Sequence, residues 1–179
     1  MPSTLPAPTL NAPAVAAPTL RPAERHDIDA ILRANNAEIP AVSLLDAATA
    51  EHLIDLADTA LVAEVDGAFA GFIFALPGGM DDFDAMNYRW FEENLDDYLY
   101  VERIVVAEGN QGRGIGRAFY DHLIDISDRG HLVSEVNISP RNDASLAFHD
   151  RFGFESIGEL TYGDDITCAK LARPLQVTG

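Results

Sequence analysis

The segment from Tyr98 to Ser127 constrains the fold more than any other part of the chain. Its first nine residues are rich in β-branched and aromatic side chains, which is typical of a central strand. Glycines follow at alternate positions, Gly112, Gly114 and Gly116, and lead into apolar residues at helical spacing. A strand that enters a helix through such a loop directs backbone N–H groups and the positive end of the helix dipole to one place. The sequence therefore predicts an anion-binding site at this loop.

Two arginines and the absence of side chains in the loop favour a phosphate as the anion. Arg113 and Arg117 supply positive charge, and the glycines let a bulky phosphate approach the backbone. The alternative is that these glycines only punctuate a loop. A dinucleotide-binding fingerprint fits poorly, because its last glycine comes two residues later and the motif belongs early in a chain.

The rest of the chain alternates helical and strand patterns, without an internal repeat. Before the central segment we expect a strand over 19–21, helices over about 25–35 and 47–56, a hairpin of strands 61–65 and 68–76, and an insertion with a short helix over 77–97. The helix of the central segment should begin near Gly112 and run to about Ser127, with Gly130 as its terminator. It should bury Ile115, Phe119, either His122 or Leu123, and Ile126.

After the central segment we expect a strand over 131–138 that Pro140 stops, and then a helix that Asn142 caps and Gly153 closes. That helix should turn Ala144, Ala147, Phe148 and Phe152 inward, and strands over 154–160 and 166–171 should follow it. These elements predict one mixed α/β domain over 18–179, behind a flexible Ala/Pro-rich leader over 1–17.

The charge balance and the residue counts exclude several classes of function. Acidic residues outnumber basic ones 29 to 12, so binding to nucleic acid or to an anionic membrane is not expected. Lys170 is the only lysine, which rules out a phosphate loop of the G-x-x-x-x-G-K-[ST] type. Cys168 is the only cysteine, so neither an internal disulfide nor a cysteine-cluster zinc site can form. The first twenty residues lack the charged start of a signal peptide, and we expect a cytoplasmic protein.

The glycine loop resembles the acetyl-CoA loop of the GNAT superfamily of N-acetyltransferases, written Q/R-x-x-G-x-G/A, and here it reads Gln111 to Gly116. A second element, Asn142-x-x-Ser145-x-x-Phe148-His149-x-x-x-Gly153-Phe154, is similar to a helix of the same family. The resemblance covers 19–175 and implies a mainly antiparallel mixed sheet whose fourth and fifth strands splay apart. It also implies acetyl-CoA as co-substrate, held by Ile104, Val105, Val106, Gln111, Gly112, Arg113, Gly114, Ile115, Gly116, Arg117, Asn142 and Ser145.

Acetyl transfer to an amine needs a base, because only the neutral amine attacks. Glu102 is the first candidate, since the two-residue strand period puts it on the same face as Ile104 and Val106 near the expected split. Glu135, on the neighbouring strand, is the second candidate. For both glutamates the alternative is a structural role in a pair with an arginine such as Arg103.

The leaving thiolate needs a proton, and most members of the family offer a tyrosine where this chain has His149. An imidazole is able to donate to a thiolate, so His149 is a candidate general acid. The alternative is that His149 only spaces its helix or bonds the coenzyme arm. Asn142 is expected to cap its helix first, and Ser145 is a weaker coenzyme contact.

The sequence gives the least information about the residues that bind the acceptor amine. Asn36, Glu38, Tyr88 and Trp90 fall in segments that the family topology places over the thioester, and an acidic, aromatic pocket suits a cationic amine. The alternative for Trp90 is packing in the core. No metal site is expected, because the cluster at Asp81, Asp82 and Asp84 lacks the spacing of a calcium loop.

These observations predict an acyltransferase that moves an acetyl group from acetyl-CoA to a primary amine of a small molecule, or to another exposed amine, by direct attack in a ternary complex. The alternative is a CoA-binding sensor or interaction module without chemistry. The sequence leaves a homodimer open.

Overall fold

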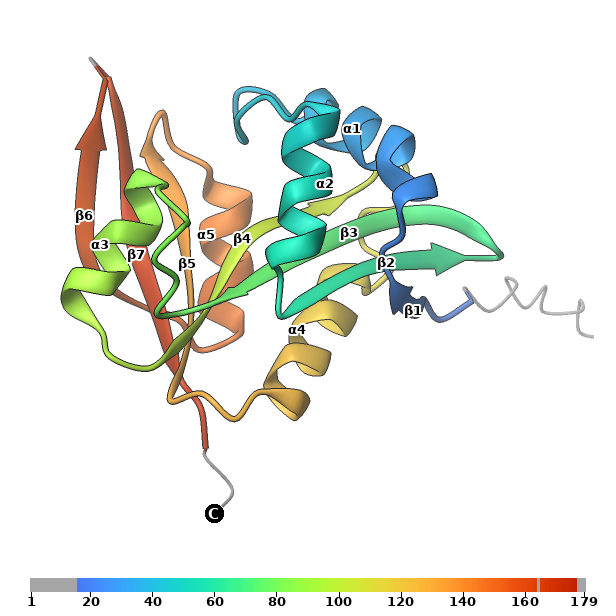
Figure 1. Cartoon of the computed structure of the whole chain (residues 1–179). Coiled ribbons are helices and arrows are strands. Elements are labelled where there is room, and N and C mark those ends of the chain that lie inside the picture. The colour runs from blue at the N-terminus through green and yellow to red at the C-terminus, as the bar shows by residue number, and fades with distance from the viewer. Residues whose placement is uncertain (1–15, 164, 177–179) are drawn as a thin grey trace, which may run out of the picture.

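The computed structural model describes residues 16–163 and 165–176, and in these residues seven strands form one sheet (Figure 1). The strand order is β1-β2-β3-β4-β5-β7-β6, and only the β4–β5 pair is parallel. The strands are β1 (Thr19–Pro22), β2 (Thr59–Val65), β3 (Ala68–Pro77), β4 (Tyr98–Val106), β5 (His131–Ser139), β6 (Glu155–Tyr162) and β7 (Ile166–Pro174). The mixed, mainly antiparallel α/β sheet expected from the sequence is confirmed.

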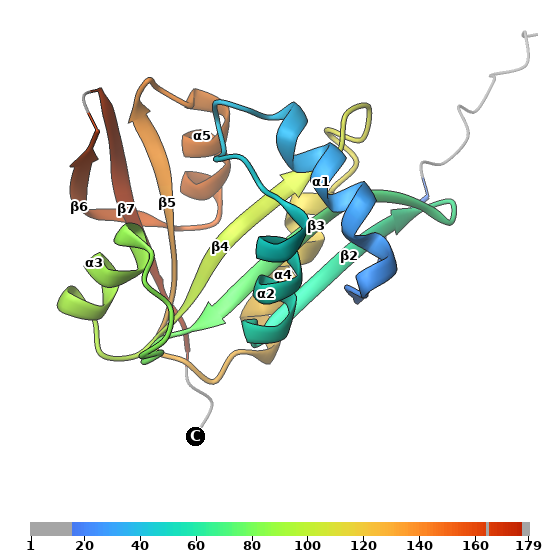
Figure 2. The ribbon, with the colours of Figure 1, turned by 45° about the horizontal axis from the view of Figure 1, so that its top comes forward.

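Helices cover both faces of this sheet (Figures 1 and 2). They are α1 (Ile28–Ala37), preceded by a 3-10 turn (Arg25–Asp27), α2 (Ala47–Leu56), α3 (Met86–Asn94), α4 (Ile115–Ile126) and α5 (Asp143–Arg151). Side chains from α1, α2 and α3 build one apolar core with Phe72 and Phe74 of β3. Side chains from α4 build a second core on the opposite face with Ile73 and Leu132. No helix of the described ranges has the length and apolar character to cross a membrane.

Two short-range expectations are confirmed. The hairpin turns at Asp66 and Gly67, which have positive φ angles of 53° and 77°. Helix α2 and strand β4 have the expected bounds. The predicted leader falls almost wholly in 1–15, which lies outside the described residues. The turn residue at 164 and residues 177–179 also lie outside them.

Strands β4 and β5 are paired for only three residues. Tyr98, Leu99 and Tyr100 pair with residues 131–133, and no residue of β4 beyond Tyr100 pairs with β5 (Figure 2). At the point of separation the Ser134 hydroxyl donates to the Val101 carbonyl at 3.4 Å. The remainder of β4, 101–106, therefore has one edge without a strand partner, which leaves its backbone groups on that side to face a ligand or solvent.

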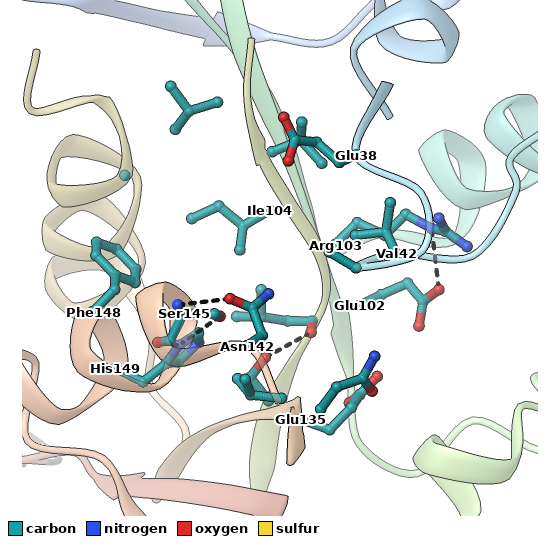
Figure 3. A pocket seen from close by; sticks show the side chains of 18 of the residues that line it. Glu38, Val42, Glu102, Arg103, Ile104, Glu135, Asn142, Ser145, Phe148 and His149 are labelled. Carbon is teal, nitrogen blue, oxygen red and sulfur yellow. Dashed lines mark hydrogen bonds and ion pairs between the residues drawn. The ribbon is translucent and has the colours of Figure 1, made fainter. Parts of the chain in front are cut away.

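A β-bulge in β4 corrects the expected position of Glu102. Phe74 and Ala75 of β3 pair with Arg103 and Val101, so Glu102 is an extra residue without a partner. The bulge shifts the alternation by one residue: Arg103 reaches the α1 side, whereas Ile104 packs on the α4 side. Glu102 interacts with Arg103 and thus does not share the face of Ile104, contrary to the strict two-residue period (Figure 3).

Helix α4 ends within one residue of the expected Ser127, but it begins later than expected and Gly130 does not terminate it. It begins at Ile115, after Gly114 in the left-handed conformation, and it ends at Ile126 because Ser127 is extended. Gly130 is therefore not its terminator; its N–H instead donates to Asp97. The buried face holds Ile115, Phe119, Tyr120 and Leu123, while Ile126 is 51% exposed.

Helix α5 is capped by Asn142 as expected, and Phe148 and Phe152 face inward as expected, but the two alanines do not. Ala144 and Ala147 are exposed, and His149 is the buried residue of the helix. Phe148, His149 and Phe152 all pack against the Tyr120 ring of α4, with ring centroids 5.0 to 5.5 Å apart within this group. The larger aromatic side chains take the helix contact, which turns the alanines toward solvent.

Candidate active site

A cavity of about 1690 Å³ opens where β4 and β5 separate (Figure 3). Its floor is the unpaired part of β4, 101–106, with residues 134–137 of β5. At one end it is lined by the glycine loop and α5, and at the other by the α1–α2 loop and the beginning of α3. The two predicted base candidates and the predicted anion site thus share one cavity.

The glycine loop has the geometry that an anion site requires. Gly112 and Gly114 have φ angles of +76° and +79°, and a Cβ placed on either would meet nothing within 4 Å. The loop is held by the Gln111 side chain, which accepts from the Gly109 N–H at 3.0 Å and donates to the Val106 carbonyl at 3.4 Å. The N–H groups of the first turn of α4 have no partner within the helix. Open space in front of unpaired N–H groups fits a diphosphate.

Gly116 has a different role from the one expected. A Cβ at Gly116 would lie 3.0 Å from the ring of Phe148. Its missing side chain therefore lets α4 and α5 pack closely. Gly116 also lines the cavity, so its coenzyme contact stays a prediction.

The two arginines of the loop point to different places. Arg117 lines the cavity with a side chain that is 77% exposed, and it pairs with Asp121 at 3.2 Å. The Arg113 guanidinium instead donates to Asn110 at 3.2 Å and lies 3.7 Å from Asp66, and Arg113 is not among the lining residues. Of these two arginines, only Arg117 is placed to offer charge to a ligand in the cavity.

Two residues of α5 face the same end of the cavity. Asn142 Oδ1 accepts from the Ser145 N–H at 3.0 Å, which caps the helix as expected. Both side chains line the cavity, so a coenzyme contact for Asn142 and Ser145 stays a prediction (Figure 3).

His149 is 2% exposed and both of its ring nitrogens have hydrogen-bond partners. Nδ1 lies 2.8 Å from the Ser145 carbonyl, which only accepts, so the hydrogen is on Nδ1. Nε2 then accepts from the Tyr120 hydroxyl at 2.7 Å. Burial lowers the pKa of His149, which favours the neutral imidazole. In this geometry His149 has no free N–H to offer to a thiolate.

Glu135 lies on β5, and each of its oxygens has a distinct environment. Oε1 accepts from Asn87 Nδ2 and from the Tyr100 hydroxyl, both at 3.0 Å. Oε2 is buried and has no hydrogen-bond partner among the described residues. Burial, followed by the negative charge of Glu102, raises the pKa of Glu135 to about 7, and the positive charge of Lys170 opposes this rise. A carboxyl with such a pKa is suited to accept a proton near neutral pH.

Glu102 lies on β4 beside the same space, and its side chain is 14% exposed. Its Oε1 lies 3.4 Å from Arg103 Nε. Burial raises the pKa of Glu102, and the charge of Arg103 is the main opposing effect. Arg103 is itself held by Asn35 Oδ1 at 2.9 Å and by the carbonyl and hydroxyl of Ser43 at 2.8 and 2.7 Å. The arginine therefore ties the bulge of β4 to α1 and to the loop after it.

Behind Glu135 lies Lys170, which is fully buried on β7. Its Nζ lies 2.5 Å from Asn87 Oδ1 and packs over the rings of Trp90 and Phe91, 5.9 and 5.3 Å from their centroids. Burial lowers the pKa of Lys170, and the charge of Glu135 opposes the change.

Of the four expected acceptor residues, only Glu38 lines the cavity. The Asn36 side chain instead bonds the N–H and carbonyl of Leu45, at 3.0 Å each, and so closes the α1–α2 loop. Tyr88 is fully buried and its hydroxyl bonds the backbone of β3. Trp90 packs against the core below Lys170, as its alternative interpretation stated. The mouth is instead formed partly by exposed apolar residues: Ile39, Leu44, Met86 and Ile166.

The sequence interpretation did not find Asn87, Tyr100, Tyr120 or a site role for Lys170. One signal was present, because a single lysine between Ala169 and Leu171 interrupts an apolar strand. The others are ordinary strand and helix residues, whose partners come from distant parts of the chain.

Comparison with known proteins identifies the fold. A model of the acetyltransferase (GNAT) family matches residues 26–154. Ard1 from Thermoplasma volcanium superposes with a TM-score of 0.72 at 18% identity, over 90% of this chain and 99% of that chain. The ribosomal-protein-S18-alanine N-acetyltransferase from Escherichia coli gives 0.66 at 19%, over 90% and 96%. The yncA structure from Salmonella typhimurium, a putative acetyltransferase with acetyl-CoA, gives 0.63 at 22%, over 89% and 95%. No curated protein matches significantly.

Proposed function

Because this chain belongs to the GNAT acetyltransferase family, we propose that it moves an acetyl group from acetyl-CoA to the primary amine of a small molecule. The family uses acetyl-CoA, and the cavity joins the two parts that such a transfer requires. One observation carries the proposal: two half-buried carboxyl groups on unpaired strand edges share one cavity with the open glycine loop.

The residues of the loop end fit the coenzyme. The N–H groups of the first turn of α4, beside the open space at Gly112 and Gly114, would bind its diphosphate, with Arg117 adding charge. The free edge of β4 would bond the pantetheine arm, and Ile104 and Val106 supply backbone groups there. A backbone N–H of the same edge would stabilise the oxyanion that forms as the amine attacks.

Glu135 is the proposed base, in preference to Glu102. Its pKa of about 7 leaves much of it ionised at neutral pH, whereas the Glu102 carboxylate is paired with Arg103. Glu135 takes one proton from the substrate ammonium, directly or through a water, and Glu102 stabilises the cation before it is deprotonated. No covalent intermediate with the enzyme is required.

The proton balance closes without an acid from the protein. An ammonium carries three protons, of which one goes to Glu135 and one stays on the amide. The third passes from the attacking nitrogen to the departing sulfur, directly or through water. This account suits His149, whose ring nitrogens are already bonded to Ser145 and Tyr120.

The far end of the cavity supports a small acceptor with a cationic amine. Glu102 and Glu135 offer negative charge on the floor of the cavity, and Glu38 offers it nearer the mouth. Leu44 and Met86, 71% and 57% exposed, add apolar contact area at the rim. An amine on a compact, partly apolar body therefore fits better than an anionic acceptor.

The test is an assay of free thiol with purified protein, acetyl-CoA and a panel of primary amines, with mass spectrometry of the products. We expect thiol release that depends on the amine and yields the N-acetyl product. Release without an acylated amine, or acylation of a hydroxyl acceptor only, would contradict the proposal. Glu135→Gln serves as the matched variant, because it keeps the shape of the side chain.

A CoA-binding sensor is the second candidate: where most of the family has a tyrosine this chain has His149, and both of its ring nitrogens are bonded within the protein. Coenzyme binding by calorimetry without thiol release from any amine would identify the sensor. Turnover with any primary amine would exclude it.

A further inference from the structure

Lys170 is a buried charged group next to the cavity for which the proposed reaction has no use. It is the only lysine of the chain and is fully buried in the middle of β7. In the antiparallel β5–β7 pair its register partner is Glu135. Residues directly opposite each other in such a pair project from the same face of the sheet. The ammonium and the proposed base are thus cross-strand neighbours.

Asn87 from α3 connects the two side chains. Its Oδ1 lies 2.5 Å from Lys170 Nζ, and its Nδ2 donates to Glu135 Oε1 at 3.0 Å. Because an ammonium only donates, it selects the amide orientation in which the oxygen faces Lys170. The amide NH₂ must then face Glu135. The ammonium therefore fixes which end of Asn87 meets the carboxylate.

This arrangement does not resemble one that serves stability. No carboxylate oxygen of the described residues lies within ion-pair distance, 4.0 Å, of Lys170 Nζ. Its neighbours include one amide oxygen, the Cys168 thiol and the faces of Trp90 and Phe91. A buried ammonium without an ion-pair partner lowers stability relative to an apolar side chain of similar length. Another reason is needed for a charge at this position.

We propose that Lys170 is a positioning residue for Glu135: it holds the Asn87 amide against the carboxylate and keeps that carboxylate ionised. This inference rests on the proposed function, because it assumes that Glu135 is the base. It concerns a residue that does not line the cavity and need not touch either substrate.

The groups that surround Glu135 determine the direction of the effect. Tyr100 and Glu102 face it from β4, Asn87 from α3, and Cys168 and Lys170 from β7. Tyr162 of β6 lies nearby. Among these, Glu102 favours the protonated form of Glu135, while Lys170 and the two hydrogen bonds favour the ionised form. Removing the ammonium therefore raises the pKa of Glu135 and leaves less base at neutral pH.

The experiment compares Lys170→Met with Lys170→Arg in the full-length chain. Both fill the space above Trp90, but only arginine keeps the charge. We expect the acidic limb of the pH profile of kcat/KM to lie about one pH unit higher in Lys170→Met. At pH values below this limb, the rate should then be about tenfold lower than in the parent. Lys170→Arg should keep the limb near its original position. The midpoint of thermal unfolding should stay unchanged or rise in Lys170→Met, and affinity for CoA should not change.

A second measurement does not depend on turnover. The carboxyl carbon of Glu135 is titrated by NMR in the protein without acceptor, in the parent, in Lys170→Met and in Asn87→Leu. Both variants should raise the pKa of Glu135, with the larger shift in Lys170→Met. A titration and a limb equal to those of the parent in both variants would overturn the inference.

The outcomes separate the inference from the proposed function. If Glu135→Gln keeps the parent rate, the assignment of the base is wrong. If Glu135→Gln is inactive while Lys170→Met keeps the parent limb, titration and rate, only the positioning role is wrong. Loss of activity in Lys170→Met with an unmoved limb and a lowered unfolding midpoint would indicate a structural role and would also overturn the inference.

Discussion

The two ends of the cavity are built in opposite ways. At the proposed coenzyme end, the loop around Gly112 and Gly114 offers open space in front of the backbone, and the one arginine of the loop that lines the cavity is largely exposed. At the proposed acceptor end, Asn87 connects the half-buried Glu135 to the fully buried Lys170. In the proposed reaction, one end would bind through the main chain and the other would act through side chains.

This difference determines how each end should respond to substitution. A site made of backbone groups tolerates changes of neighbouring side chains but not a change of backbone conformation or the addition of a Cβ. A network of buried charges responds to a single altered atom, because each member changes the pKa of the others. The same cavity should therefore show affinity effects at one end and pH effects at the other.

The largest expected effect is at Glu135. Glu135→Gln should lower kcat/KM at pH 7 about 100-fold or more, because the amide cannot take a proton. In the parent, activity should rise with pH as Glu135, with a pKa of about 7, deprotonates, which produces an acidic limb. The rate that remains in Glu135→Gln should not show this limb. Thiol release over a pH series with one fixed amine measures both, and the titration of the amine itself cancels between variants.

Glu102→Gln is the matched variant for that measurement. Glu102 raises the pKa of Glu135, so removing its charge should move the acidic limb to lower pH rather than abolish it. If Glu102→Gln instead abolishes the limb and Glu135→Gln only moves it, the two roles are exchanged and Glu102 is the base.

The second effect tests the coenzyme end. Gly114→Ala should weaken CoA binding more than about tenfold, because the added Cβ enters the space expected for the diphosphate. Gly109→Ala is the control: Gly109 has the same φ of +79° and equal space, but it does not line the cavity. Both substitutions should cost about 1–2 kcal/mol of stability. Equal CoA affinity in the two variants, measured by calorimetry, would contradict the loop assignment.

Local rules predicted the secondary structure around the glycine loop. The strand before the loop, the helix after it and the cap at Asn142 depend on a few neighbouring residues, so their spacing in the sequence is informative. Gly116 shows the limit of this approach. Its glycine is required by the Phe148 ring, which comes 32 residues later and whose approach only the packed structure reveals.

The acceptor end could not be predicted in the same way. The pairing of Lys170 with Glu135 depends on the register of β5 and β7, which no local pattern gives. The bulge at Glu102 breaks the alternation from which its face was inferred. Tyr88 and Trp90 have the composition of a recognition surface, yet both pack in the core. Side-chain networks assembled from four separate elements leave little signal in sequence spacing.

The third prediction concerns the boundary between the two ends, at His149. Tyr120→Phe removes the donor to Nε2 and should cost about 1 kcal/mol of stability while changing turnover by less than about threefold. Tyr88→Phe is the control, because that hydroxyl is also buried but bonds backbone away from the cavity. If His149 were the acid, its imidazolium, with a pKa already lowered, would be lost as the pH rises, and the rate would fall toward neutral pH. Such a fall, removed by His149→Gln, would restore the acid role.

The smallest effect should come from the two arginines of the glycine loop. Arg117→Ala should weaken CoA binding about twofold at low salt, and the difference should shrink as salt is added, because the guanidinium is solvated and shared with Asp121. Arg113→Ala should leave the affinity unchanged, since Arg113 turns to Asn110 and Asp66 outside the cavity. Calorimetric titration at two salt concentrations compares the pair. A loss of more than about tenfold for either arginine would mean that side-chain charge, rather than the backbone of the loop, binds the diphosphate, and the contrast between the two ends would not hold.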